Sequence, residues 1–123
     1  AVLGALSRGD IGTLFPDTDP GNKGMSSLRI LNKAAEIMKE EGFTLGNLDC
    51  VVVAEEPKIA PFRDKIIRVI AKALYAEPGS VSVKGKTKEG IGEVGRKAAI
   101  EAYAVATLRE CSFSGTDRPG EEV

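Results

Sequence analysis

Three polar loops contain the residues in this 123-residue sequence that are best suited to chemistry. The first, Asp10–Gly24, reads DIGTLFPDTDPGNKG and offers carboxylates that can accept hydrogen bonds from hydroxyl groups or bind metals. The second, Glu55–Pro61, reads EEPKIAP and offers backbone groups in a segment framed by two prolines. The third, Lys86–Arg96, reads KTKEGIGEVGR and combines cations, a hydroxyl and a carboxylate. That combination within one short loop suits a site for phosphate and magnesium.

Better-known motifs do not account for these loops. Asp17 and Asp19 stand at the first and third positions of an EF-hand-like loop, but Asn22 occupies position six, which requires glycine, and Leu28 occupies position twelve, which requires glutamate. A helix-entry turn with Asx hydrogen bonds is the stronger interpretation. GIGEVG matches the G-x-G-x-x-G spacing, yet no strand runs directly into it and no second parallel strand follows. KGKTKEG lacks Walker A spacing. Each loop taken alone is interpreted as a solvated surface loop.

Composition excludes several classes of function. The net charge of −1 gives no electrostatic reason to expect a nucleic acid or an anionic membrane as partner. No apolar run approaches the roughly 20 residues needed to cross a bilayer. The sequence has no histidine, so the commonest general base and metal ligand is unavailable. Two cysteines, Cys50 and Cys111, do not make a disulfide framework, and Cys50 is interpreted as a small buried hydrophobe.

The elements that must position the loops begin with two amphipathic helices. The apolar stripe of the first, predicted over residues 26–42, comprises Leu28, Leu31, Ala35 and Met38. Ser26 or Ser27 caps its start, and Gly42 ends it in the left-handed conformation. The second, residues 62–75, has Pro61 in its first turn and directs inward Ile66, Ile67, Ile70, Ala73 and Leu74. Residues 1–9 resemble the end of an apolar helix, which predicts a fragment or processed form of a longer protein.

Strand patterns alternate with these helices. We predict a turn over 43–47, a strand over 48–56 and a second strand over 81–87 with Val81 and Val83 on one face. The alanines of residues 98–110 favour a helix, but strict alternation of side-chain type favours a strand, which we prefer. The predicted fold class is α/β (α+β), with helices on one face of a sheet. Residues 1–111 form one domain, and the polar residues 112–123 form a tail predicted to be disordered.

Four stretches together resemble the 2-C-methyl-D-erythritol 2,4-cyclodiphosphate synthases: Asp10–Pro20, Phe43–Pro61, Val81–Glu89 and Gly95–Leu108. The resemblance extends from residue 1 to about residue 110. It implies a β-α-β type domain with a four-stranded sheet, a homotrimer formed through the sheets, and active sites between subunits. It also implies an enzyme of non-mevalonate isoprenoid biosynthesis, in the bacterial cytoplasm or in a plastid. That enzyme cyclises 4-diphosphocytidyl-2-C-methyl-D-erythritol 2-phosphate and releases CMP, using zinc and magnesium or manganese.

The resemblance implies a role for each loop. Asp10, Ile11 and Gly12 match a turn that contacts methylerythritol, and the loop closing over the substrate comprises Phe15, Pro16, Asp17, Thr18 and Asp19. The cytosine pocket, read largely by main-chain groups, comprises Ala54, Glu55, Glu56, Pro57, Lys58, Ile59 and Ala60. Thr87 matches a threonine that binds the diphosphate and stabilises the transition state, and Glu89 matches a magnesium ligand. Arg96 matches an arginine near the trimer axis, where the family can hold an isoprenoid diphosphate.

The sequence departs from the family at several of these positions. Lys86 and Lys88 replace hydroxyl residues and are predicted to strengthen contact with phosphate, while Glu93 replaces an aromatic residue and would repel an axial phosphate. The family's zinc ligands, an Asp-x-His pair and a further histidine, would precede Ala1. A non-catalytic trimer that binds a cytidine nucleotide or an isoprenoid diphosphate is therefore the alternative hypothesis. A general α/β interaction domain is a third.

Overall fold

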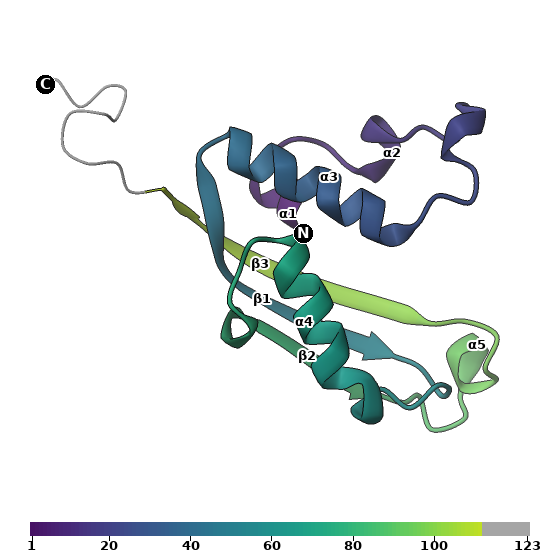
Figure 1. Cartoon of the computed structure of the whole chain (residues 1–123). Coiled ribbons are helices and arrows are strands. Elements are labelled where there is room, and N and C mark those ends of the chain that lie inside the picture. Colours follow the sequence, from purple (N-terminus) through teal and green to yellow (C-terminus); the bar gives the residue numbers. More distant parts are fainter. Residues whose placement is uncertain (112–123) are drawn as a thin grey trace, which may run out of the picture.

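A computed structural model describes residues 1–111, and the predicted tail at 112–123 lies outside them. Its helices are α1 (Val2–Ala5), α2 (Ile11–Leu14), α3 (Ser27–Glu40), α4 (Arg63–Ala73) and α5 (Gly92–Gly95). Its strands are β1 (Phe43–Val53), β2 (Val81–Lys86) and β3 (Glu101–Glu110), and the 3-10 turns are η1 (Pro20–Asn22), η2 (Ala60–Phe62) and η3 (Pro78–Ser80). The arrangement is a mixed α+β fold with helices packed on a small sheet (Figure 1).

The sheet has the strand order β2-β1-β3. β1 and β2 run parallel, joined by the crossover through α4, and Val53 at the end of β1 pairs with Lys86 at the end of β2. β3 runs antiparallel to β1 on its other side, so Glu101 at the start of β3 also pairs with Val53. The segments that follow β1 and β2 and the segment that precedes β3 therefore meet at one end of the sheet.

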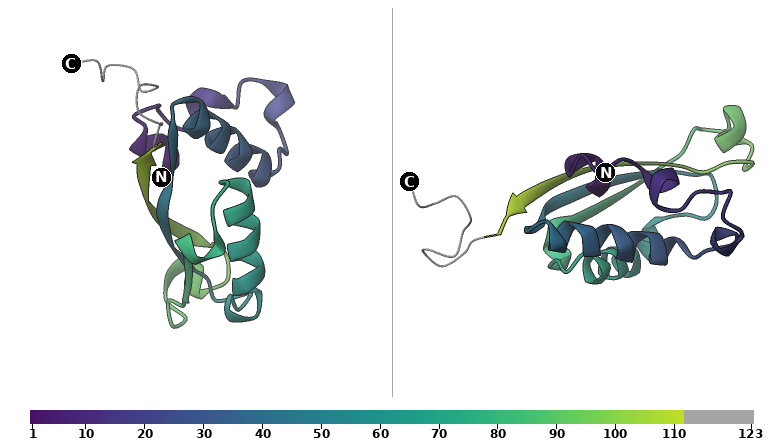
Figure 2. Two further views of the ribbon diagram at one scale, coloured as in Figure 1. Left: turned by 60° about the vertical axis from the view of Figure 1, so that its left-hand side comes forward. Right: turned by 90° about the horizontal axis from the view of Figure 1, so that it is seen from above.

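The hydrophobic core lies between one face of the sheet and the helices. Figure 2 shows α3 and α4 together on that face. Fully buried side chains of Met38 on α3 and Leu74 after α4 pack toward Leu48, Val81 and other sheet residues. On the opposite face, Tyr103 and Val105 of β3 are 60% and 70% exposed. Helices thus cover only one face of this sheet, as predicted.

Both long helices are confirmed. Ser26 caps α3, its hydroxyl accepting a hydrogen bond from the Leu28 backbone N–H, and Gly42 follows α3 with φ of +83°. The sequence predicted Pro61 in the first turn of the second helix. In the structure α4 begins at Arg63, and Pro61 lies in the separate turn η2. The apolar N-terminal segment forms the single helical turn α1, and the backbone at Ser7 then takes a positive φ.

The ambiguous segment 98–110 contains a strand, β3, so its alternation outweighs the helix propensity of its alanines. The turn predicted over 43–47 is wrong, because these residues form the first part of β1. The pairing of β1 with β3 shifts register between Leu45 and Asn47, and Gly46 is the residue of β1 at this irregularity. A side chain at Gly46 would lie 2.7 Å from Thr107 Oγ1, so the glycine here permits close approach of β3 and does not mark a hairpin.

The described residues form three strands, one fewer than the resemblance implies. Within these same residues, no helix combines the length and apolar character needed to pass through a membrane. Two of the polar loops selected from the sequence, the one with Lys58 and the one with Lys86 and Thr87, leave the sheet from the end where β1 and β2 finish.

Candidate functional site

The ends of β1 and β2 bring two of the predicted loops together. The Ala54 N–H donates to the Lys86 carbonyl over 2.9 Å and extends the parallel pairing beyond Val53. From this point residues 54–60 and 86–90 leave the sheet side by side. Loops at the carboxyl ends of parallel strands are a frequent place for ligand binding in α/β folds. The second and third polar loops of the sequence therefore form one structural unit, which we call the paired loops (residues 54–60 and 86–90).

A cavity of about 190 Å³ lies between the paired loops. It is lined by Ala54, Lys58, Ile59, Ala60, Arg63, Gly85, Lys86 and Thr87. Three of these residues are cations, and Thr87 adds a half-buried hydroxyl. Cations with a hydroxyl on a concave surface can bind phosphate oxygens through charge-assisted hydrogen bonds. Arg63 and Gly85 were not selected from the sequence, and only their place just after or just before a selected loop could have indicated them.

Close backbone approaches hold the paired loops against the sheet and against the following segment. A side-chain carbon at Gly85 would lie 2.9 Å from Ile59 Cβ, so the first of the paired loops packs directly on β2. A side-chain carbon at Gly95 would lie 2.2 Å from the Gly90 carbonyl carbon. Such distances exclude any side chain unless the backbone moves. Within the GIGEVG pattern, the first and last glycines thus pack against each other, and Gly90 and Gly92 take positive φ values of +81° and +74°.

Polar contacts add to this packing. Glu55 Oε1 accepts hydrogen bonds from the backbone N–H groups of Lys88, over 2.7 Å, and of Gly90, over 3.4 Å. Glu56 instead pairs with Lys97 Nζ at 3.1 Å. Glu93 on α5 forms an ion pair with Arg96, the residue that follows the helix. Of the predicted site residues, Glu93 on α5 and Arg96 just after it therefore do not line the cavity.

The loop Asp10–Gly24 is bonded mainly to itself. Asp10 caps α2, its Oδ1 accepting from the Thr13 backbone N–H over 2.9 Å and from Thr13 Oγ1 over 3.0 Å. These hydrogen bonds, the backbone one first, lower the pKa of Asp10 below its ordinary value. Asp19 caps η1 through the Gly21 N–H, and the Pro16 carbonyl accepts from Asn22 Nδ2. The Asx interpretation, which was made for residues 17–24, is thus confirmed at Asp19, and Asp10 is an additional helix cap.

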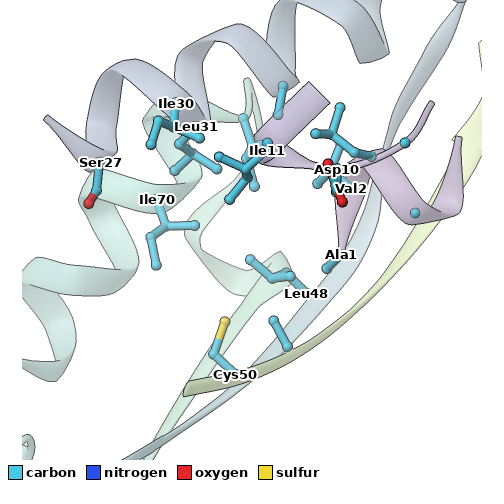
Figure 3. A pocket seen from close by; sticks show the side chains of 17 residues that line it. Ala1, Val2, Asp10, Ile11, Ser27, Ile30, Leu31, Leu48, Cys50 and Ile70 are labelled. Carbon is cyan, nitrogen blue, oxygen red and sulfur yellow. The ribbon is translucent and has the colours of Figure 1, made fainter. Parts of the chain in front are cut away.

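A second, larger cavity of about 770 Å³ lies where this loop meets α3, α4 and the sheet. Asp10, Ile11 and Gly12 line one side of it. Figure 3 shows Ile11, Leu31 and Ile70 around the space above Leu48 and Cys50. Its lining is mostly aliphatic. Burial, followed by the charge of Asp49, raises the pKa of the Cys50 thiol, which keeps the thiol neutral and agrees with its interpretation as a small hydrophobe.

Within one chain, the structure therefore separates the predicted site residues into two groups. The small cavity is lined by six of them: Ala54, Lys58, Ile59, Ala60, Lys86 and Thr87. Asp10, Ile11 and Gly12 line the large one. Neither cavity is lined by Phe15, Pro16, Asp17, Thr18 or Asp19. Residues of both groups can act on one ligand only if an additional surface, such as a second copy of the chain, brings them together.

The described residues fit the metals that the resemblance implies to different degrees. Across residues 1–111 there is no group of three or more His, Cys, Asp or Glu side chains placed to hold a metal ion. Zinc prefers three or four such protein ligands, so these residues do not fit zinc. Magnesium is usually held by one or two carboxylates together with substrate phosphates. Glu89, exposed on the loop that carries Thr87, fits that simpler requirement.

Comparison with known proteins gives a consistent result. Residues 1–109 match the YgbB family. The 2-C-methyl-D-erythritol 2,4-cyclodiphosphate synthase of Synechococcus elongatus is 48% identical over 108 residues, which cover 88% of this chain and 68% of that enzyme. The solved structure described as IspF (Plasmodium falciparum) CDP complex is similar with a TM-score of 0.79 at 38% identity, covering 90% of this chain and 66% of that chain.

A further solved structure, the CDP-bound form of 2C-methyl-D-erythritol-2,4-cyclodiphosphate synthase, is similar with a TM-score of 0.78 at 30% identity. The match covers 89% of this chain and 70% of that chain. This chain thus spans about two thirds of the length of the relatives it matches. Two of these related structures contain CDP, a ligand with a cytosine base and a diphosphate.

Proposed function

This chain belongs to the YgbB family, in which the relatives described above are 2-C-methyl-D-erythritol 2,4-cyclodiphosphate synthases, and we propose that it contributes the nucleotide-binding and phosphate-binding loops of that cyclising lyase. The observation that supports the proposal most is the cavity that unites Lys58, Lys86 and Thr87 from loops far apart in the sequence. The comparisons support this interpretation over the non-catalytic binder, because the named relatives are enzymes of the non-mevalonate isoprenoid pathway.

In the proposed reaction, both reacting groups belong to one substrate. An oxygen of the 2-phosphate of 4-diphosphocytidyl-2-C-methyl-D-erythritol 2-phosphate attacks the phosphorus nearest the methylerythritol. A new P–O bond closes the ring, the bond from that phosphorus to the CMP oxygen breaks, and CMP leaves with the electron pair. No protein nucleophile is needed, so a sequence without histidine can still serve this chemistry by positioning and charge stabilisation.

The paired loops would make three contributions to this reaction. Backbone groups of residues 54–60 would hold the cytosine base, in a segment that Gly85 keeps against the sheet. The cations Lys58 and Lys86 would neutralise phosphate charge. The Thr87 hydroxyl would donate a hydrogen bond to the diphosphate oxygen whose charge increases in the transition state. Each role needs a fixed group more than a titratable one.

We propose that a neighbouring copy completes the site with its loop Asp10–Gly24. In one chain the two groups of residues line different cavities. The uncovered sheet face offers an interface, since it exposes apolar atoms of Tyr103 and Val105 beside the Asp49–Lys84 ion pair. Large exposed apolar side chains that lie together mark interaction surfaces. A homotrimer assembled through these faces would place one chain's paired loops near the next chain's Asp10.

Divalent metal would act with the substrate at this site. Glu89 would hold magnesium or manganese together with the diphosphate, and the bound ion would supply Lewis-acid stabilisation of phosphate charge. The family's zinc is not assigned to any of residues 1–111, which lack a fitting ligand set. Arg96, paired with Glu93 in the same chain, would reach an isoprenoid diphosphate near a trimer axis only if that ion pair opened.

Incubation of the protein with the cytidylylated substrate and divalent metals is expected to release CMP and the cyclic diphosphate in equal amounts. CDP is expected to raise the melting temperature, because a ligand that binds only the native state stabilises it. A folded protein that releases no CMP would reject the enzymatic proposal. A folded protein whose melting temperature CDP leaves unchanged would also reject nucleotide binding.

A further inference from the structure

We propose that Glu55 is a positioning residue, whose carboxylate holds residues 86–90 so that Thr87 keeps its place in the small cavity. The catalytic consequence of this role rests on the proposed function, whereas the structural consequence does not. The sequence pointed to this segment only for its main-chain groups. The structure instead assigns a distinct task to the Glu55 side chain, and that task couples the base-binding loop to the phosphate-binding loop.

The contacts that carry the inference come from one carboxylate oxygen. Glu55 Oε1 accepts from the Lys88 N–H over 2.7 Å and more weakly from the Gly90 N–H over 3.4 Å. The shorter of these is a charge-assisted hydrogen bond of ordinary good geometry. The two N–H groups lie just beyond Thr87 in the chain. A shift of the backbone at Lys88 would therefore move the threonine hydroxyl as well.

The loop needs an external contact because its own backbone is strained. Glu89 has φ of +53° and Gly90 has φ of +81°, and the first of these is unfavourable for a residue with a side chain. Within the loop, the Ile91 N–H donates to the Lys88 carbonyl over 3.0 Å, and the Glu89 N–H lies 3.4 Å from Thr87 Oγ1. In the described part of the chain, Glu55 provides the only side-chain hydrogen bonds that reach residues 86–90 from another segment.

Glu55 is itself well anchored. It follows Ala54, which is 4% exposed and whose N–H donates to the Lys86 carbonyl at the end of the parallel ladder. The Glu55 carboxylate thus projects from a fixed strand end toward a strained turn. This arrangement suits a group that orients a catalytic residue, because a short link from rigid backbone limits the movement of the loop.

The first test measures the loop directly by amide hydrogen exchange in the full chain. Glu55→Ala removes the acceptor, and the Lys88 and Gly90 amides are expected to exchange about tenfold faster or more. Glu55→Gln keeps a carbonyl oxygen at the same position, and its exchange is expected to stay within about threefold of wild type. Glu77→Ala, which removes an exposed acid that precedes the opposite end of β2, is the matched control and should leave both amides unchanged.

Unchanged exchange in Glu55→Ala would overturn the proposal. Faster exchange in Glu55→Gln than in Glu55→Ala would also overturn it, because Gln keeps an acceptor oxygen at this position and Ala does not. If Glu55→Ala does not fold, Glu55→Asp, which withdraws the carboxylate by one methylene, takes its place with the same expected acceleration. These outcomes do not depend on catalytic activity.

The second test separates positioning from general stability. Glu55→Ala is expected to lower kcat about 10- to 100-fold, a typical range for a residue that orients another, with a smaller change in KM. Combining it with Thr87→Ala should slow turnover little beyond Thr87→Ala alone, because both changes remove the same contribution. Fully additive losses in kcat would overturn the catalytic part. A wild-type protein that releases no CMP would reject the proposed function, and amide exchange would then decide the role of Glu55.

Discussion

The paired loops and the loop Asp10–Gly24 are both polar, yet they are built in different ways. The paired loops are tied to one another and to the sheet by Glu55, by Gly85 against Ile59 and by the end of the β1–β2 ladder. The loop Asp10–Gly24 forms hydrogen bonds within itself, with Asp10 and Asp19 as caps of short helical turns. One region is fixed by contacts distant in sequence, and the other by contacts a few residues away.

This difference indicates a division of work. A site that stabilises developing phosphate charge needs groups held in place before the substrate arrives, and the paired loops meet that need. The loop Asp10–Gly24 is stabilised by its own hydrogen bonds, so it can contact a ligand bound to another chain without a change in the rest of its own fold. We therefore expect changes in the paired loops to alter both chemistry and stability, and changes at Asp10 to remove a contact with the substrate while altering stability only locally.

The largest effect is expected for Thr87→Ala. If Thr87 contacts the diphosphate oxygen mainly in the transition state, turnover should fall about 100-fold or more, while CDP affinity changes much less. Steady-state kinetics and calorimetry with CDP measure the two quantities. Thr44→Ala on β1, outside both cavities, is the control. Equal losses in turnover and affinity would remove Thr87 from its catalytic role and would weaken the distinction between the two regions.

A smaller effect is expected when the packing of the paired loops is disturbed without changing a polar group. Gly85→Ala places a carbon 2.9 Å from Ile59 Cβ and should destabilise the fold by about 1–3 kcal/mol, with a loss of CDP affinity. Gly79→Ala, where nothing lies within 4 Å, is the matched control and should be close to neutral. Chemical denaturation measures both variants. Similar stability of the two variants would show that the contact between Ile59 and β2 is not tight.

The smallest effect is expected in the loop Asp10–Gly24, on the pKa of Asp10. The pKa of Asp10 is lowered in the folded state, so its contribution to stability is present above its ordinary pKa of 3.8 and is lost as the pH falls through the lower folded value. NMR titration should give a midpoint below 3.8. Thr13→Val removes the hydroxyl but keeps the backbone N–H, the larger cause, so the midpoint should rise without reaching the ordinary value. A midpoint that is normal in the wild type would contradict the cap.

Sequence reasoning was most successful where a pattern is local. The alternation of residues 98–110 identified β3, and Ser26 and Gly42 marked the ends of α3. It was wrong at Phe43–Asn47, because Gly46 and Asn47 have the composition of a turn while their actual environment is set by Thr107 on β3, 60 residues away. The Asn47 N–H donates to that threonine's hydroxyl, a contact that no local pattern contains.

The candidate site shows the same limit. The sequence selected Lys58, Lys86 and Thr87 by type and by resemblance, and the topology of β1 and β2 places them around one cavity. The role of Glu55 was not found, since its partner amide lies 33 residues away and is a backbone group that any residue would offer. This contact could not be predicted because its two residues lie far apart in the chain, although a carboxylate that accepts from a backbone N–H is a common interaction.

The central claim is that one copy's paired loops act together with another copy's Asp10 loop, and subunit complementation tests it most directly. Asp10→Ala and Thr87→Ala variants are prepared separately, mixed under conditions of subunit exchange, and assayed for CMP release. Mixed assemblies contain interfaces where an intact Thr87 faces an intact Asp10, so the mixture should be several-fold more active than the two variants assayed apart. If mass spectrometry shows that subunits have exchanged and CMP release remains the average of the two separate variants, the shared site is contradicted.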